Sequence, residues 1–445
     1  MKKTYCIITF GCQMNKSDSE RIAAYLEFFG FKNELDKKRA GLVVLNTCGI
    51  RQTAENRNYG LIPDIKKENP GVKIILAGCL SERKDVIRRL SKWVDVFLPI
   101  KDLPELYKKL NLKKLPSTKK DNIFGSGDYL GIKPKVDSKI SAYIPIGNGC
   151  DNFCSYCVVP FARGREQYRP ANEIIKEAEE FIKNNYKEII LIAQNVNSYS
   201  TVASKKDLKY FPNKKNGQAI NFAELLDVVG SLSGNYWVHF ISSHPKNMSD
   251  DLIEVVARGG RIAPHVHLPT QAGDDKILAV MNRKYTAKHY LSLVKKIRLA
   301  IPDVGLSSDI IVGFPGETKK QFAQSEKLMR QAKFDMVYTS RFSPRPGTAA
   351  YKLKDNVSSD EKARREDALI KILRQTASKN NQKFLNREIV VLVGEKNKRG
   401  EWLGRNGQYI TVKIKGAADK ELTGRFSLIK IIACHDFGLD GEFVK

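Results

Sequence analysis

The sequence has few cysteines and no long apolar run. Eight cysteines occur among 445 residues, too few for a disulfide scaffold, and their clustering indicates metal binding in a reducing compartment. No apolar run approaches the roughly 18 residues that a transmembrane helix needs, and the apolar part of the N-terminal MKKTYCIITFGC is too short for a signal peptide. We therefore expect a cytoplasmic protein with no membrane partner.

Acidic residues are also few relative to basic ones. The chain holds 76 Lys and Arg against 49 Asp and Glu, which gives a formal net charge of +27. Such an excess usually indicates a polyanionic partner, and nucleic acid is the commonest one. A basic proteome or a solubility adaptation is the alternative explanation. The length predicts two to four domains with a large core.

A tight cysteine triplet, by contrast, is present in GCDNFCSYCVVPFARGR at residues 149–165. Cys150, Cys154 and Cys157 have the spacing C-x3-C-x2-C, and the next cysteine is Cys434. Structural zinc sites take four protein ligands, and cubane iron–sulfur clusters normally take four thiolates. Three thiolates therefore predict a cluster with one iron left open for a substrate or cofactor. The alternatives are a zinc site completed by a distant ligand, or three buried thiols.

The same loop, with Tyr156 just before its third cysteine, resembles the radical S-adenosylmethionine (SAM) superfamily. In that superfamily the open iron chelates the amino and carboxylate groups of SAM, and an electron from the reduced cluster cleaves SAM to a 5′-deoxyadenosyl radical. The resemblance implies that Cys150, Cys154 and Cys157 are catalytic. The continuation VVPFARGR narrows the resemblance to the methylthiotransferases.

The first part of the chain alternates between strand-like and helix-like segments. Such an order predicts a parallel sheet with helices on its faces. Strands are expected at residues 5–10, 42–45, 72–77 and 94–98, and helices at residues 17–29, 51–68 and 81–90.

Three further cysteines directly follow the first three of these strands. Cys12, Cys48 and Cys79 would lie beyond the carboxyl ends, where open α/β sheets bind ligands, and could converge on one metal. We expect a second cluster with three protein thiolates; chance placement is the alternative, and Cys6 fits a core thiol. The order GCQMN, NTC and GC resembles the methylthiotransferase N-terminal domain, whose auxiliary cluster carries the sulfur to be inserted.

A second series of alternating elements follows a lysine-rich linker. Six βα units are two short of a full eight-stranded barrel, and an incomplete, laterally open (β/α)6 barrel matches the radical SAM core and would admit a large substrate. Strands are expected at residues 141–147, 188–193, 237–241, 266–268, 305–312 and 335–342, with helices at residues 172–183, 222–232, 249–257, 275–281, 287–300 and 319–332.

Polar residues and glycines gather at the expected strand ends of this barrel, where active sites of such folds are built. Gly313 and Gly316 permit close backbone approach to a ligand, although turn geometry also explains them. AQNVNSY and IIVGFPGET resemble the family at the matching places. The resemblance implies SAM contacts near Tyr156, Gln194, Asn195 and Gly313.

Two weaker features lie in the same domain. His265 and His267 share one face of their strand by alternation, and could bind a metal, but hydrogen-bonded barrel residues or substrate contacts are commoner. Residues 200–217 form a basic stretch that could touch a phosphate backbone or be a solvated insertion.

The last part of the chain changes to short β runs after a charged helix at residues 358–380. Regular short strands predict a small barrel. Trp402, Tyr409 and Phe426 are interleaved with basic residues, as in nucleic-acid binders, although a barrel core explains them equally. The position and the LGRN run resemble the RNA-binding TRAM domain; Cys434 fits a core thiol. The β runs are at residues 388–395, 401–414, 424–434 and 441–444.

The resemblance covers nearly the whole chain. It implies an α/β protein with a Rossmann-like methylthiotransferase N-terminal domain that holds the auxiliary cluster, an incomplete (β/α)6 radical SAM barrel and a small all-β TRAM barrel. The expected boundaries are residues 1–118 for the first domain, 119–135 for the linker, 136–380 for the radical SAM core and 383–445 for the TRAM domain.

The motifs GCQMN, NTCGIR, CVVPFARGR and SPRPGT most resemble methylthiotransferases that act on tRNA. They imply conversion of N6-(dimethylallyl)adenosine next to the anticodon (position 37) to its 2-methylthio form, with two [4Fe-4S] clusters and SAM as cofactors. Carbon 2 of adenine has no acidic proton, so a radical is needed there. The implied partners are the tRNA anticodon stem-loop, a reductant such as flavodoxin or ferredoxin, and a sulfur donor or iron–sulfur carrier.

Three alternatives remain open from the sequence. The same chemistry could act on N6-threonylcarbamoyladenosine in tRNA or on an aspartate of ribosomal protein S12. A non-catalytic iron–sulfur RNA-binding protein would keep the cysteines and cleave no SAM.

Overall fold

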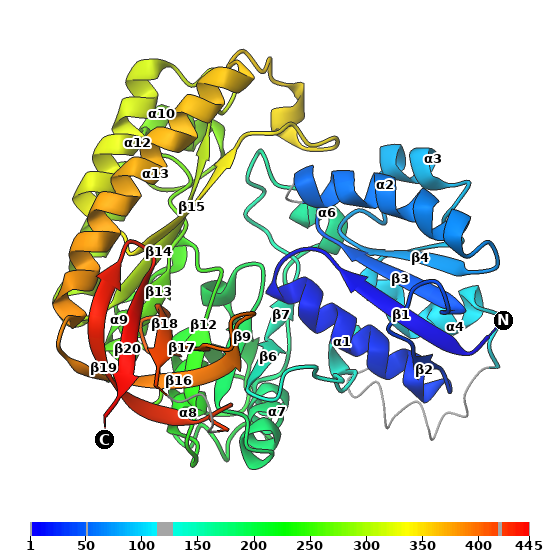
Figure 1. Ribbon diagram of the computed structural model, residues 1–445, viewed down its shortest axis with the longest axis horizontal. Coiled ribbons are helices and arrows are strands. Elements are labelled where there is room, and N and C mark those ends of the chain that lie inside the picture. The colour runs from blue at the N-terminus through cyan, green and yellow to red at the C-terminus, as the bar shows by residue number, and fades with distance from the viewer. Residues whose placement is uncertain (1, 50–51, 114–127, 417–420, 445) are drawn as a thin grey trace.

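The chain folds into three consecutive parts, which run from blue to red in Figure 1. The computed structural model describes residues 2–49, 52–113, 128–416 and 421–444. The first part lies on one side of the central barrel, and the last part lies against the barrel and its final helix (Figure 1).

The first part is a parallel sheet of five strands in the order β2-β1-β3-β4-β5. The apolar run of β3 is buried along its whole length, because helices cover both faces of the sheet. This confirms the predicted α/β arrangement. The strands are β1 (Thr4–Thr9), β2 (Lys32–Asn33), β3 (Leu42–Thr47), β4 (Lys73–Gly78) and β5 (Val96–Leu98); the helices are α1 (Gln13–Phe28), α2 (Gln52–Glu68), α3 (Lys84–Leu90) and α4 (Leu106–Lys109).

Helix α1 begins at Gln13, four residues before the predicted start at residue 17. Its first turns bury polar side chains, among them Asn15, Ser17 and Asp18. An apolar periodicity cannot detect a turn of that kind. These buried polar groups are the first sign that the start of α1 faces something other than a hydrophobic core.

The predicted linker at residues 119–135 is only partly described. Residues 119–127 lie outside the described residues. Tyr129, Leu130 and Ile132 are buried and pack against the core of the first part. The described end of the linker is therefore packed into the first part of the chain.

The central part has six parallel strands, as predicted. They form two three-stranded groups, β6-β9-β12 and β13-β14-β15, and one isolated parallel bridge joins Val238 to Ile262 between them. Ile190 and Ile192 on β9 pack into the core of the first part, whereas Ile189 and Leu191 pack under the helices. The strands are β6 (Ser141–Pro145), β9 (Glu188–Ile192), β12 (Trp237–Phe240), β13 (His265–His267), β14 (Gly305–Val312) and β15 (Met336–Arg341).

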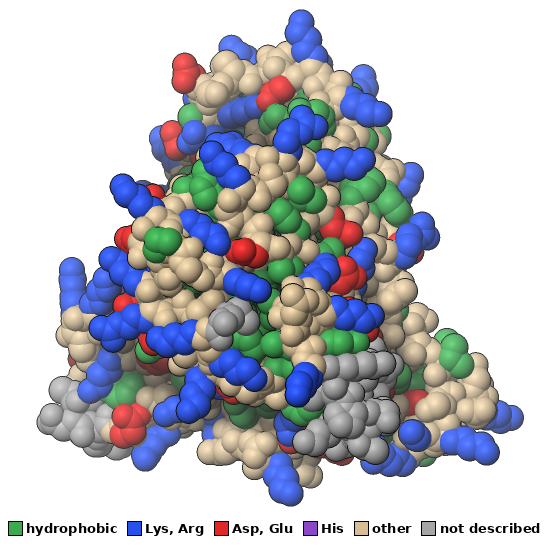
Figure 2. Space-filling model, turned by 90° about the vertical axis from the view of Figure 1, so that its right-hand side faces the viewer, with side chains coloured by type: hydrophobic (Ala, Val, Ile, Leu, Met, Phe, Trp, Pro, Cys, Tyr) green, Lys and Arg blue, Asp and Glu red, His purple; other side chains and the backbone are tan. Residues whose placement is uncertain are grey.

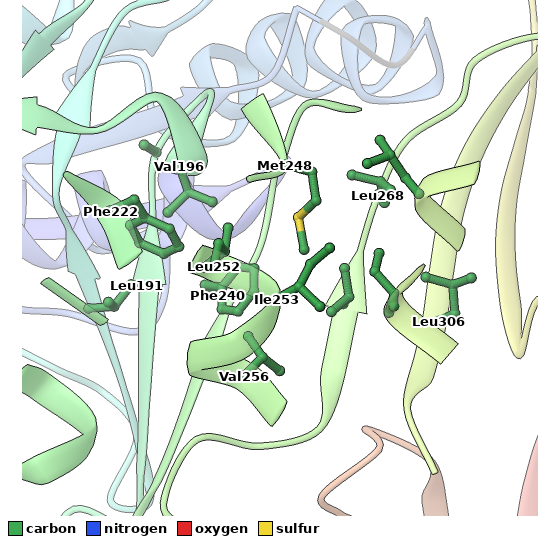
Figure 3. Close-up of a cluster of buried hydrophobic side chains, with 14 of the residues drawn as sticks. Leu191, Val196, Phe222, Phe240, Met248, Leu252, Ile253, Val256, Leu268 and Leu306 are labelled. Atoms are coloured by element: carbon green, nitrogen blue, oxygen red, sulfur yellow. The ribbon is translucent and has the colours of Figure 1, made fainter. Parts of the chain in front are cut away.

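Helices cover the outer face of these strands (Figure 1). Figure 3 shows part of this core, where Phe240 of β12 lies beside Leu252 of α9, with Leu191 and Leu306 on either side. The strands and helices alternate along the chain and form the expected βα units. The helices are α7 (Ala171–Lys183), α8 (Phe222–Ser231), α9 (Asp250–Ala257), α10 (Asp275–Val280), α11 (Ala287–Ala300) and α12 (Lys319–Ala332).

The last part is a closed five-stranded barrel, reached through α13 (Ser359–Asn381). The strand order is β16-β17-β18-β20-β19. The predicted run at residues 401–414 is two strands, because the chain turns at residues 407–410. The strands are β16 (Glu388–Lys396), β17 (Trp402–Asn406), β18 (Thr411–Lys415), β19 (Phe426–His435) and β20 (Gly438–Phe443).

The basic stretch at residues 200–217 is anchored at both ends. Strand β10 (Ser200–Val202) pairs with β11 (Ala219–Asn221), and Phe211 between them is buried. Lys205 and Lys206 are exposed. Within the described part of the chain, no helix has the length and apolar character needed to cross a bilayer.

Candidate functional site: two cysteine triplets at adjoining strand ends

The cysteine loop of the barrel is held in place by its backbone. Gly149 has a φ of +83°, and a Cβ there would lie 2.1 Å from the Arg165 carbonyl oxygen, so only glycine fits. Gly149 N–H donates to Gln194 Oε1 at 2.6 Å, and Cys150 N–H donates to the Gly164 carbonyl at 3.2 Å. The loop is thereby fixed to the end of β9 and to the start of the segment after α6 (Val159–Arg163).

Two N–H groups point at the sulfurs of this loop. Arg283 Nη1 donates to Cys154 Sγ at 3.4 Å, and Asn152 Nδ2 donates to Cys150 Sγ at 3.5 Å. Arg283 is itself buried and donates through Nη2 to the Pro269 carbonyl at 2.9 Å. Hydrogen bonds to sulfur are among the features that tune iron–sulfur clusters. The donor set on this loop therefore fits a thiolate-bound cluster.

The thiols lie where solvent reaches them although protein surrounds most of each side chain. Burial raises the pKa of Cys150, and burial together with Cys154 raises the pKa of Cys157. Such thiols keep their protons until a metal displaces them, because metal binding requires the thiolate. Cys79 of the N-terminal sheet also contributes to the raised pKa of Cys157, so the two triplets are near each other.

The other triplet follows three neighbouring strands. Cys12 follows β1 and is the N-cap of α1, Cys48 directly follows β3, and Cys79 directly follows β4. The strands lie side by side in the order β1-β3-β4. Cys48 and Cys79 are buried and Cys12 is solvent-accessible. Desolvation raises the pKa of Cys12, and a nearby arginine, Arg163, opposes that rise.

Glycines let the loops that carry these cysteines approach closely. A Cβ on Gly11 would lie 2.8 Å from Cys48 Cβ. A Cβ on Gly49 would lie 3.2 Å from Cys79 Cβ and 3.1 Å from Val158 Cγ2. Since Val158 directly follows Cys157, the structure brings the N-terminal cysteine loops against the cysteine loop of the barrel.

The two triplets are not closed around a common point. Among the described residues, no three His, Cys, Asp or Glu side chains are grouped closely enough to hold one metal ion.

Two arginines of the barrel reach across to the first part of the chain. Arg163 Nη2 lies 2.5 Å from Asp18 Oδ2 in an ion pair whose side chains are 2% and 1% exposed. Arg345 pairs with Glu55 at 3.4 Å and hydrogen-bonds to Gln52 Oε1. Burial lowers the pKa of Arg345, while Glu55 and the Cys48 thiol act in the opposite direction. Positive charge from the barrel thus lies beside the N-terminal cysteines.

The predicted SAM contacts lie around the barrel mouth. Tyr156 is half-buried against the barrel core, and burial raises its pKa. Gln194 Oε1 is occupied by Gly149, whereas Asn195 Oδ1 is buried without a hydrogen-bond partner among the described residues. Gly313 N–H already donates to Glu317 Oε2 at 2.7 Å. All four remain predictions, and Asn195 has the acceptor best placed to receive a ligand.

His265 and His267 both hydrogen-bond to one hydroxyl. Ser307 Oγ lies 3.1 Å from His265 Nε2 and 2.9 Å from His267 Nδ1. This agrees with hydrogen-bonded barrel residues rather than with a metal site. His265 also stacks on Tyr409 of the last part, with ring centroids 5.1 Å apart.

Three aromatic residues of the last part pack against other side chains of the protein. Trp402 is buried in the small barrel's own core. Tyr409 packs on His239 and His265, and Phe426 packs on Trp237 with centroids 4.8 Å apart. These contacts favour the alternative that the three aromatic residues serve packing, and their contact with RNA stays a prediction.

Sequence reasoning missed the charged residues that join the two triplets. Arg163 and Arg345 lie inside motifs used only for resemblance, VVPFARGR and SPRPGT, and Asp18 lies three residues after GCQMN. Arg283 had no motif. A signal was present in α1, where acidic Asp18 interrupts a helix otherwise expected to pack on a sheet, but its partner lies 145 residues away in sequence.

Two protein families match parts of this chain. Residues 144–329 match the Radical SAM superfamily, and residues 4–99 match the uncharacterized protein family UPF0004. Among solved structures, the radical S-adenosylmethionine methyltransferase TsrM from Kitasatospora setae matches 79% of this chain and 77% of that chain at 14% identity, with a TM-score of 0.48.

Full-length relatives are much closer in sequence. The tRNA-2-methylthio-N(6)-dimethylallyladenosine synthase of Carboxydothermus hydrogenoformans is 38% identical over the whole of both chains. That of Clostridium tetani is 36% identical over the whole of this chain and 97% of its own. The chain therefore belongs to the family of tRNA-2-methylthio-N(6)-dimethylallyladenosine synthases within the radical SAM superfamily.

Proposed function

We propose that this protein converts N6-(dimethylallyl)adenosine next to the anticodon of tRNA to 2-methylthio-N6-(dimethylallyl)adenosine. The observation that carries the proposal is full-length similarity, at 36–38% identity, to synthases named for that product. Two cysteine triplets at adjoining strand ends support it, because one activity must generate a radical and another must deliver sulfur.

Membership of the radical SAM superfamily implies SAM and a [4Fe-4S] cluster. Cys150, Cys154 and Cys157 would hold that cluster, which when bound supplies the electron for reductive cleavage of SAM. Arg283 orients Cys154 by its hydrogen bond, and Gln194 fixes the loop through Gly149. Asn195 then presents a buried acceptor to SAM; Tyr156 and Gly313 complete the proposed SAM contacts.

We extend the proposal to a second cluster at Cys12, Cys48 and Cys79. Their place after three adjacent strands, and the contact between Gly49 and Val158, support a site that faces the first one. Asn15 Oδ1 accepts a hydrogen bond from the protonated Cys12 thiol at 3.2 Å, and metal binding would displace that proton. This site would supply the inserted sulfur, replenished by a sulfur donor or iron–sulfur carrier.

The RNA partner is supported by charge. The formal net charge is +27, and Lys and Arg side chains are spread over the face drawn in Figure 2 with fewer Asp and Glu between them. Binding to an anticodon stem-loop should weaken steeply as salt rises, because phosphate contacts release counterions. Salt-independent binding would argue against tRNA. The electron would come from a reductant such as flavodoxin or ferredoxin.

The test of the function is nucleoside mass spectrometry of tRNA from a deletion strain, with and without the cloned gene. Loss of the 2-methylthio-N6-(dimethylallyl)adenosine signal, with accumulation of N6-(dimethylallyl)adenosine and restoration by the gene, is expected. Loss of a threonylcarbamoyl derivative instead would assign the other tRNA substrate. Unchanged tRNA would overturn the proposal.

The cluster count is tested by anaerobic reconstitution and iron analysis. Simultaneous replacement of Cys150, Cys154 and Cys157 by Ala should remove about half the iron, and so should replacement of Cys12, Cys48 and Cys79, since metal binding needs the thiolates. Cys434→Ala is the matched control, because Cys434 lies on β19 of the small barrel, where its thiol donates to the Asn381 carbonyl at 3.1 Å. Complete loss of iron from either triple variant would contradict two separate sites.

A further inference from the structure

We infer that Arg163 is a positioning residue for the N-terminal cysteine site: the barrel domain inserts this guanidinium beside Cys12 and Cys79 and thereby sets the reduction potential of the metal group held there. The inference rests on the proposed function, in that it needs a redox group at Cys12, Cys48 and Cys79. It adds that the electronics of this site depend on the neighbouring domain.

The guanidinium is held rigidly from both sides. Nη2 pairs with Asp18 on α1 at 2.5 Å, and Nη1 donates to Asn148 Oδ1 at 3.1 Å. Asn148 Nδ2 returns a hydrogen bond to the Arg163 carbonyl at 3.1 Å, and Tyr129 O–H donates to Asn148 Oδ1 at 3.0 Å. Both side chains of the ion pair are almost fully buried. The charge therefore has one position and little solvent around it.

The position is next to the cysteines. Asp18 belongs to the helix whose N-cap is Cys12. Val158 stands five residues before Arg163, and its Cγ2 would lie 3.1 Å from a Cβ on Gly49, the residue that follows Cys48. An arginine side chain is not deprotonated in proteins, so the guanidinium carries its positive charge at this interface.

A fixed positive charge stabilises the more negative, reduced form of a neighbouring redox group. Net charge, hydrogen bonding and solvent exposure set the potentials of iron–sulfur clusters. Interaction between buried charges is screened far less than between exposed ones. The paired Asp18 acts in the opposite sense. Removing Arg163 and removing Asp18 should therefore move the reduction potential in opposite directions.

The experiment measures the reduction potential of the N-terminal group in the full-length chain in which Cys150, Cys154 and Cys157 are replaced by Ala, by EPR-monitored titration after reconstitution. Arg163→Gln should shift the midpoint to more negative values. Asp18→Asn should shift it to more positive values. Arg163→Lys, which keeps the charge, should give the smallest shift.

Arg365→Gln is the matched control. Arg365 is a buried arginine of α13 that pairs with Glu317, before α12, at 2.8 Å, so its charge belongs to the barrel and not to the interface with the N-terminal sheet. It should lower thermal stability without moving the potential. Shifts of the same sign in Arg163→Gln and Asp18→Asn, or no shift in either, would overturn the inference while iron is retained. Loss of all iron from the triple-alanine background would overturn the second cluster of the proposed function, and the inference with it.

Discussion

The central barrel is joined to its neighbours in two different ways. At its mouth, buried ion pairs connect it to the N-terminal sheet. At its floor, where the strands begin, neutral rings connect it to the small barrel. The mouth pairs are Arg163 with Asp18, Arg21 with Glu177 and Arg345 with Glu55; the floor contacts are Tyr409 with His239 and His265, and Phe426 with Trp237.

The difference follows from what each interface must do. Replacing a buried ion pair by apolar side chains is often neutral or stabilising, so charge at the mouth is a poor choice for stability alone. Charge is useful beside the six proposed cluster ligands, where it fixes orientation and supports thiolates. The floor has no such task and uses aromatic packing, which contributes about 0.5–1.5 kcal/mol per ring pair beyond buried area.

Glu177→Ala should produce the largest loss of stability. Glu177 accepts from Arg21 at 3.2 Å and from Arg169 at 2.5 Å, so its removal leaves two buried guanidiniums without their carboxylate. Breaking one side of a buried pair costs about 3–5 kcal/mol. Urea unfolding measures it, with Glu179→Ala, an exposed carboxylate of the same helix, as control. Equal midpoints for the two variants would contradict the importance of the mouth pairs.

Tyr409→Ala tests the floor and should cost less, about 1–3 kcal/mol, because Tyr409 is only partly buried. The small barrel should detach more readily, while iron content stays at the wild-type value, because no cysteine triplet lies at the floor. Tyr409→Phe keeps the rings and loses only the hydrogen bond from Arg405 Nη1 at 3.0 Å. A loss of iron in Tyr409→Ala would contradict the prediction that the floor contacts do not affect the cysteine triplets.

The two cysteine triplets show how much the sequence could predict. The triplet of Cys150, Cys154 and Cys157 lies within one loop, so spacing alone indicated a metal site. The prediction that Cys12, Cys48 and Cys79 follow neighbouring strands required a sheet order, and alternating βα segments supplied it because parallel strands place their ends at one edge. Strand and helix positions were accurate where apolar periodicity was strong, as in α11 and β14.

What escaped prediction depends on contacts distant in sequence. Asp18 and Arg163 are separated by 145 residues, and no local pattern pairs them. The same holds for Tyr409, which fits a strand turn, an RNA platform or a docked ring equally well until its neighbours His239 and His265 are known. Residue type limited the possibilities, and only the packing of domains selected one.

Lowering the pH should reduce the free energy of unfolding through the buried histidines at the floor. Burial lowers the pKa of both His239 and His265. For His239, Arg405 lowers the pKa further and Glu188 raises it. For His265, the nearby His239, His267 and Arg405 all lower it further. The folded-state pKa of His239 and His265 lies below the unfolded value of about 6.5, so stability is full above that pH and falls as pH drops below it, by about 1.4 kcal/mol per unit for each histidine. Urea unfolding between pH 7.5 and 5.5, followed by the fluorescence of Trp237 against Phe426, should show this slope. Burial also lowers the pKa of His244, to about 2, so three histidines contribute to this slope. His265→Asn should therefore reduce the slope by about a third; an unchanged slope would mean that the imidazole of His265 is not held neutral in the folded protein.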